Sequence, residues 1–162
     1  MNLLICEILD KVSKLKTKKE KVAWLKEHNT DGLRMVIKAS FDPKMKWLLP
    51  EGEVPFRRND APEGTEHTDL HMESRKLFHF IEGGNYDITQ NKRESLFIQM
   101  LEGLQENDAD VLVAAKDKSL HRKYKGLSEN VVKEAFDWDD NFMVIEHDQY
   151  PQAPGAANGW LF

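Results

Sequence analysis

The chain has 162 residues, 40% of them hydrophobic, and a formal net charge of −5. This length and composition are typical of one domain with a single core, and no apolar run reaches the roughly 18–20 residues of a membrane span. The apolar start carries Glu7 and Asp10 and no basic residue, which argues against a signal peptide. A lone Cys6 cannot form an internal disulfide. We therefore expect a soluble intracellular domain in which Cys6 is a buried, inert thiol.

Helical signals follow one another along the chain, and strand signals are weak. Apolar residues recur at a spacing of three and four, and "TKKE" at Thr17–Glu20 has the form of a capping box. These signals predict about seven short helices. The first three cover about 3–14, Thr17 to about His28, and Thr30 or Asp31 to before Pro43. The other four cover about 69–82 up to Gly83–Gly84, Thr89 through Leu104, Asn107 through Ala115, and Ser128 to about Phe136.

Two other segments have no helical period. Residues 50–68 combine proline and glycine without a repeat, which predicts a loop. The sequence "YPQAPGAANG" at Tyr150–Gly159 predicts a flexible tether that ends in Trp160, Leu161 and Phe162. These three apolar side chains either fold back onto the domain or dock on a partner. We expect an all-α fold with a single compact domain over 1–140 and a flexible tail over 141–162.

The charge is distributed unevenly along the chain. Residues 11–46 hold eleven Lys/Arg against four Asp/Glu, and residues 47–110 hold six against fourteen. Residues 111–136 are again basic, with six against three, and residues 137–162 hold five acids and no base. Each basic segment is either a solvated helix face or part of a surface that attracts a polyanion.

No pattern in the chain predicts catalysis. "KYKG" at Lys123–Gly126 has lysine where the Lys-x-Asp-Gly motif of nucleotidyltransferases has aspartate. His67 and His71 have the spacing of two zinc ligands on a helix, but a third ligand is not identifiable. The aspartate clusters are typical of helix ends and acidic surfaces. We therefore predict neither an enzyme nor a metal or cofactor site.

The stretch "HRKYKGLSENVVKEAF" at His121–Phe136 predicts an anion site instead. A glycine, Gly126, precedes a helix capped by Ser128, and the start of that helix presents backbone N–H groups and the positive end of the helix dipole. Arg122, Lys123 and Lys125 add charge beside it, and the absence of a Cβ at Gly126 lets a phosphate approach the backbone. The alternative is an ordinary turn into a helix that happens to have cations nearby.

The helices, taken as an ordered series, resemble the N-terminal DNA-binding domain of the ATP-dependent DNA ligases of T-even-type phages. "SKLKTKKEKVAWLKEHN" at Ser13–Asn29 is similar to the opening of that domain, and "LRMVIKASFDPKMKW" at Leu33–Trp47 to its third helix. "LFHFIE" at Leu77–Glu82 is similar to its Phe-Ile-Glu helix, and "ENDADVLVAAKDK" at Glu106–Lys118 to its Asp-Val-containing helix.

The family also carries an Arg-Asp pair, a short loop, Gly-x-Ser and a helix that ends in an aromatic residue. Lys116–Asp117, Gly126, Ser128 and Phe136 stand at these positions here. The loop between Asp117 and Gly126 is longer and more basic than that of the family. The resemblance covers residues 1 to about 140, without the catalytic nucleotidyltransferase and OB-fold domains.

In the ligases this domain grips the duplex backbone in the minor groove around the nick. The resemblance therefore implies a DNA-backbone binder without joining activity of its own. The residues expected to contact DNA are Lys14, Lys16, Lys18, Lys19, Arg122, Lys123, Lys125, Gly126 and Ser128.

The end of the chain, "NGWLF", resembles the sliding-clamp-binding tails of phage replication and late-transcription proteins. Together these features predict a non-catalytic phage accessory protein in the cytoplasm of the infected bacterial host. Its expected partners are duplex DNA and, through Trp160, Leu161 and Phe162, a sliding clamp or another replication or transcription protein. The alternative is a protein-binding adaptor whose ligase-like scaffold no longer binds DNA.

Overall fold

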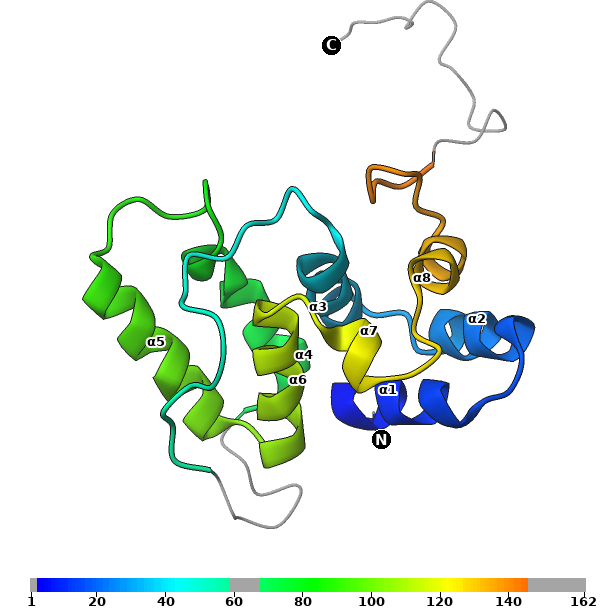
Figure 1. The fold of residues 1–162 in the computed structure, drawn as a ribbon, viewed down its shortest axis with the longest axis horizontal. Coiled ribbons are helices and arrows are strands. Elements are labelled where there is room, and N and C mark those ends of the chain that lie inside the picture. Colours follow the sequence, from blue (N-terminus) through cyan, green and yellow to red (C-terminus); the bar gives the residue numbers. More distant parts are fainter. Residues whose placement is uncertain (1–2, 59–67, 146–162) are drawn as a thin grey trace, which may run out of the picture.

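The computed structural model describes residues 3–58 and 68–145, and within these ranges the chain is helical, without a strand (Figure 1). This confirms the all-α prediction. The predicted apolar end at Trp160, Leu161 and Phe162 lies outside the described residues. The elements are α1 Ile5–Lys14, α2 Lys18–Glu27, α3 Asp31–Phe41, α4 Leu70–Glu73, the 3-10 helix η1 Ser74–Phe80, α5 Gln90–Gly103, α6 Glu106–Lys116, α7 Leu120–Lys123 and α8 Glu129–Phe136.

Local capping explains where most helices begin. The hydroxyl of Thr17 accepts a hydrogen bond from the amide of Glu20 at 3.1 Å, and the Glu20 carboxylate accepts one from the Thr17 amide at 3.1 Å. This is the predicted capping box. Thr30, Thr89 and Ser128 cap α3, α5 and α8 in the predicted way, each accepting from a backbone amide three residues later.

The segment predicted as one helix over 69–82 is helical from Leu70 to Phe80, but only its first turn is α-helix. Regular α-helix covers only α4, which Asp69 caps, and the chain then tightens into η1. It becomes extended at Ile81, which forms an isolated antiparallel bridge with Trp47. The Leu48 amide donates to the Phe80 carbonyl at 2.8 Å. Pairing with this distant segment satisfies backbone groups that a longer helix would have satisfied internally.

Two further corrections concern the segment before α8. α6 begins at Glu106 and not at Asn107, because the side chain of Gln105 accepts hydrogen bonds from the Asn107 and Asp108 amides at 2.8 and 3.4 Å. The predicted basic loop contains the helical turn α7. Its first residue, Leu120, is completely buried and holds that turn against the core.

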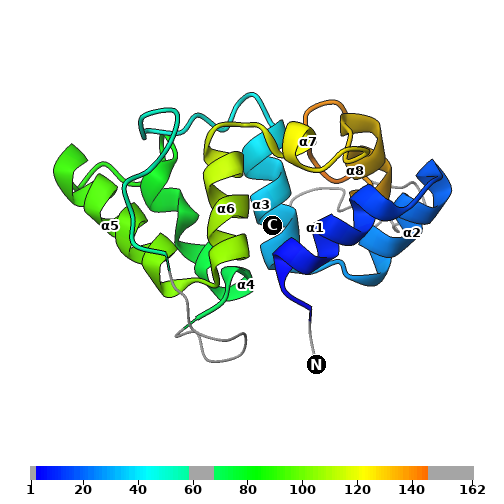
Figure 2. The same ribbon diagram turned by 60° about the horizontal axis from the view of Figure 1, so that its bottom comes forward.

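α3 and α6 lie in the middle of the molecule and pack against each other (Figure 2). α4, η1 and α5 lie on one side of this pair, and α1, α2, α7 and α8 lie on the other. The core is continuous through all of them, with Leu9, Leu33, Leu101 and Val132 at 0% exposure, and it extends to Phe142. No helix in the described ranges is long and apolar enough to cross a membrane.

This arrangement brings the two basic segments of the sequence together. Residues 11–46 and 111–136 pack on each other through contacts between α2 and α8 and between α3 and α6. The elements on the other side of the α3–α6 pair, α4, η1 and α5, hold four Lys/Arg against three Asp/Glu. The acidic residues of the segment 47–110 therefore lie mostly outside these three helices.

Candidate nucleic-acid interface

The two basic segments meet at Gly126. α2 packs against α8, and the side chain of Lys21 on α2 lies over the backbone of Gly126. A Cβ built on Gly126 would collide with Nζ of Lys21 and would lie 2.8 Å from its Cε. The residue has a φ of 89°, a conformation that side chains other than glycine rarely adopt. A lysine ammonium thus lies beside a bare stretch of backbone just before α8.

The start of α8 presents the donors that an anion needs. The Ser128 hydroxyl accepts from the Val131 amide at 3.3 Å, as its position predicted. The N-terminus of the helix carries the positive end of its dipole. Lys21 lies close in space and the exposed Lys125 is close in the chain, so this corner combines mobile cations with fixed partial charges.

The predicted residues of the first basic segment differ in how far other groups neutralise them. Lys14 pairs with Asp10 at 2.9 Å, and Lys18 pairs across the helix interface with Glu134 at 3.2 Å. Lys16 and Lys19 are exposed, and neither forms an ion pair with a carboxylate of the described residues. Both ion pairs are solvent-exposed, so each is weak and can be exchanged for a phosphate.

The predicted cations of the second segment surround α7. Arg122 and Lys125 are exposed and form no ion pair within the described ranges. The ammonium of Lys123 lies 5.5 Å from the centre of the Tyr124 ring, a cation–π distance. Arg122 and Lys123 belong to α7 itself, and Leu120 fixes the position of that turn against the core.

Sequence reasoning missed Lys21. It lies three residues after Lys18 on α2, and positions three apart share a helix face. That spacing could have placed Lys21 in the same basic surface as Lys18. No sequence feature placed this face against Gly126, more than a hundred residues further on.

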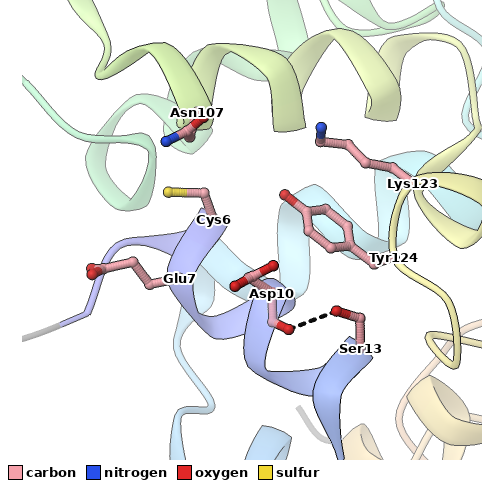
Figure 3. Close-up of a pocket in the computed structure, with 7 residues that line it drawn as sticks. All are labelled: Cys6, Glu7, Asp10, Ser13, Asn107, Lys123 and Tyr124. Carbon is pink, nitrogen blue, oxygen red and sulfur yellow. Dashed lines mark hydrogen bonds between the residues drawn. The ribbon is translucent and has the colours of Figure 1, made fainter.

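A polar cleft lies next to this corner, between α1 and the segment from α6 to α7 (Figure 3). It has a volume of about 360 Å³ and is lined by Cys6, Glu7, Asp10, Ser13, Asn107, Lys123 and Tyr124. Cys6 is buried as predicted. Burial, with the charge of Asp108 next in importance, raises the pKa of its thiol, so the thiol stays protonated and unreactive at neutral pH.

The histidine pair singled out in the sequence is only partly described. His67 lies outside the described residues. The two ring nitrogens of His71 contact the Thr30 hydroxyl at 3.1 Å and the Leu3 carbonyl at 2.9 Å. His71 therefore ties the starts of α1, α3 and α4 together. Within the described ranges, no group of three or more metal-ligating side chains comes together.

Comparison with known proteins gives one match. The model of a family of unknown function, DUF6433, matches residues 8–122, from within α1 to within α7. No curated protein and no solved structure matches the chain. Because the matched region is well over half of the 162 residues, the chain belongs to the DUF6433 family.

Proposed function

We propose that this chain is a non-catalytic DNA-binding protein that holds duplex DNA through its phosphate backbone. The observation that carries the proposal is the meeting of the two basic segments, with Lys21 over Gly126 at the start of α8. Exposed lysines and a helix N-terminus are the groups that contact phosphates in proteins that bind DNA. The ordered likeness to the N-terminal domain of T-even-type phage ligases supports the same assignment.

The biological setting that we propose follows from that likeness. The protein is a phage accessory factor of DNA metabolism in the cytoplasm of the infected bacterium. Its tail, ending in Trp160, Leu161 and Phe162, tethers it to a sliding clamp or another replication or transcription protein. A tether of this kind raises the local concentration at a partner without a large interface.

The experiment is DNA binding measured by fluorescence anisotropy with intact, nicked and single-stranded probes over a range of salt concentrations. Each neutralised phosphate contributes about −0.9 to the slope of log K against log salt, so about five contacts give about −4 to −5. Reversing the charge of Lys123 and Lys125 flattens the slope by about one for each lost contact. We expect little sequence preference, because phosphate contacts carry no base information.

Two variants sharpen this test. Lys21→Glu removes the cation over Gly126 and should weaken binding and flatten the slope. Lys92→Glu makes the same charge change on α5, on the other side of the α3–α6 pair, where Lys92 is exposed, and should leave the slope unchanged. Absence of binding to any duplex at low salt, or equal effects of the two variants, contradicts the proposal.

A second candidate function has a specific observation in its favour. Met143, Val144 and Ile145 are 59%, 65% and 42% exposed and follow one another directly. Three adjacent exposed apolar side chains are typical of a protein-binding surface. If DNA binding is absent, a protein-binding adaptor on the same scaffold becomes the better assignment, and Val144→Asp should then abolish partner binding without loss of stability.

A further inference from the structure

The cleft between α1 and the α6–α7 segment has the features of a ligand site, and of its lining residues only Lys123 belongs to the proposed DNA contacts. Its floor is formed by Cys6 and Tyr124, each 7% exposed. Figure 3 shows the Tyr124 hydroxyl pointing from the α7 side into the space that Cys6 and Asp10 border on α1. Asn107 on α6 closes the opposite side.

The Tyr124 hydroxyl is the group that faces the cleft most directly. The side chain is more than nine-tenths buried, but its hydroxyl lines the cleft and is not one of the completely buried polar atoms without a partner. Within the part of the chain that the structure describes, this hydroxyl forms no hydrogen bond, whereas the neighbouring Ser13 donates to the Asp10 carbonyl at 2.7 Å. Tyr124 therefore offers an unused donor and acceptor at the bottom of the cleft.

Two carboxylates border the cleft that this hydroxyl faces. Asp10 and Glu7 lie one helical turn apart on α1 and both line the cleft. Burial is the main reason why the pKa of Tyr124 is raised, and Asp10, Asp108 and Asp110 raise it further. The chain's own cations already gather at the mouth, where Lys14 pairs with Asp10 and Lys123 lies against the Tyr124 ring.

We propose that this cleft binds an alkylammonium group, which donates hydrogen bonds to the Asp10 carboxylate and the Tyr124 hydroxyl. An ammonium carries three donors and no acceptor, which matches the carboxylate and hydroxyl oxygens that border the cleft; the exposed Lys14 is the cation that it would replace on Asp10. The volume of about 360 Å³ is sufficient for a short amine chain. The group is supplied either by a free polyamine or by a lysine side chain of a protein partner, and neither Asp10 nor Tyr124 is among the residues proposed to contact DNA.

The test is a titration of the full ¹⁵N-labelled chain, followed by two-dimensional NMR at constant ionic strength. The probes are 1,4-diaminobutane, the blocked amino acid N-acetyl-lysine methylamide, and the uncharged 1,4-butanediol. We expect saturable shifts at the amides of Cys6, Asp10 and Tyr124 with a dissociation constant of about a millimolar for a ligand of this size. The diol should cause none.

Three variants locate the binding. Tyr124→Phe removes only the hydroxyl, and Asp10→Asn removes only the charge; each should weaken binding about tenfold, the usual effect of losing a hydrogen bond to a charged group. Glu27→Gln removes an exposed carboxylate of α2 and should leave the affinity unchanged. The melting temperature of each variant shows whether it is folded. If one of the two pocket variants does not fold, the affinity of the other still tests the site.

The outcomes are distinct. Saturation by the diamine alone assigns the cleft to a free polyamine, and saturation by the blocked lysine as well assigns it to a protein side chain. Shifts that fail to saturate at about 50 mM of either amine overturn the proposal. So do equal affinities of the wild type and both folded pocket variants. A loss of DNA binding by Lys21→Glu with an unchanged diamine titration would show that the two sites are separate.

Discussion

Two single residues, Gly126 and Asp108, fix the backbone on this side of the molecule. Gly126 has a φ of 89° and lies under Lys21, so the turn and the proposed anion site need the same glycine. Asp108 is completely buried on α6. Its Oδ1 accepts from the Cys6 amide at 2.9 Å, at the start of α1, and no group of the described residues hydrogen-bonds to its Oδ2.

A substitution at Gly126 should affect folding as well as binding. From the sequence, Gly126 is expected to matter for DNA binding, because the absence of a Cβ lets a phosphate approach the backbone. The positive φ changes that expectation, because a branched side chain in this conformation costs about 1–3 kcal/mol. We expect Gly126→Val to lower the free energy of unfolding by at least about 1 kcal/mol in urea denaturation. Lys21→Met should leave stability within about 0.5 kcal/mol and still weaken DNA binding. An unchanged stability of Gly126→Val would contradict the strain argument.

The pH dependence of stability should report on Asp108. Burial raises the pKa of this carboxyl above its ordinary value, although the hydrogen bond from Cys6 opposes the shift. The folded protein therefore holds the proton more tightly than the unfolded chain does. The resulting stabilisation is fully present below the ordinary pKa of an aspartate and is lost as the pH rises through the raised value.

Asp108→Asn keeps an acceptor for the Cys6 amide and removes the titration. The stability of the wild type relative to this variant should therefore increase as the pH falls from neutrality towards about 4, near the ordinary aspartate pKa. Thermal unfolding of both proteins across this range measures the difference. Parallel stability curves for the two proteins would show that Asp108 has no raised pKa.

At the scale of the elements, one buried lysine connects α6 to the segment after α3. The side chain of Lys116 is 1% exposed. Its ammonium donates to the carbonyls of Pro50 and Gly52 at 2.6 and 3.1 Å and to the Asp117 carboxylate at 2.6 Å. The ligase resemblance aligns Lys116–Asp117 with an Arg-Asp pair, and in this structure the pair fixes a loop to the C-terminal end of α6.

Replacing that lysine should be costly. Lys116→Met leaves two carbonyls and the partly buried Asp117 without their donor, and breaking a buried ion pair in this way costs about 3–5 kcal/mol. Since Asp117 is 25% exposed, we expect a loss nearer to about 3 kcal/mol in urea unfolding. The comparison variant Lys76→Met breaks a pair in which Lys76 is 60% exposed and Glu73 13% exposed, and it should cost about 1 kcal/mol, less than the loss at Lys116. Equal effects of the two substitutions would contradict a structural role for Lys116.

At the scale of the whole molecule, the fold brings together two basic segments that are far apart along the chain. α1, α2, α7 and α8 bring the basic segments together on one side, and α4, η1 and α5 lie on the other. The local positive potential of these basic segments orients a polyanion before contact, even when the net charge of the protein is negative. The family match ends at residue 122, so Gly126 and α8 lie beyond it.

The function of the apolar chain end is testable at this scale too. Deletion of Trp160–Phe162 should leave the melting temperature unchanged if these residues bind a partner, because the domain core would lose nothing. Binding to a sliding clamp or another replication protein, measured by calorimetry, should then disappear, since each seated apolar side chain contributes about 1.5–3 kcal/mol. A lower melting temperature with no change in partner binding would show that these residues fold back onto the domain.

The sequence by itself determined the helical class, most helix starts and the burial of Cys6. These features depend on local relations: a Thr or Ser hydroxyl reaches an amide three residues away, and apolar spacing marks the buried side of a helix. The charge segments were also readable, because they are properties of composition. The predicted DNA-binding role, in contrast, came from a resemblance and remains a proposal.

Only the tertiary structure decided which distant residues meet. The bridge from Trp47 to Ile81 replaced the end of a predicted helix, and Asp108 supports the start of α1 from 102 residues away. The contact between Lys21 and Gly126, and the cleft floored by Cys6 and Tyr124, likewise join segments that no local pattern relates. The physical reason is that side-chain capping and helical period extend over a few residues, whereas packing of one core places residues from both ends of the chain side by side.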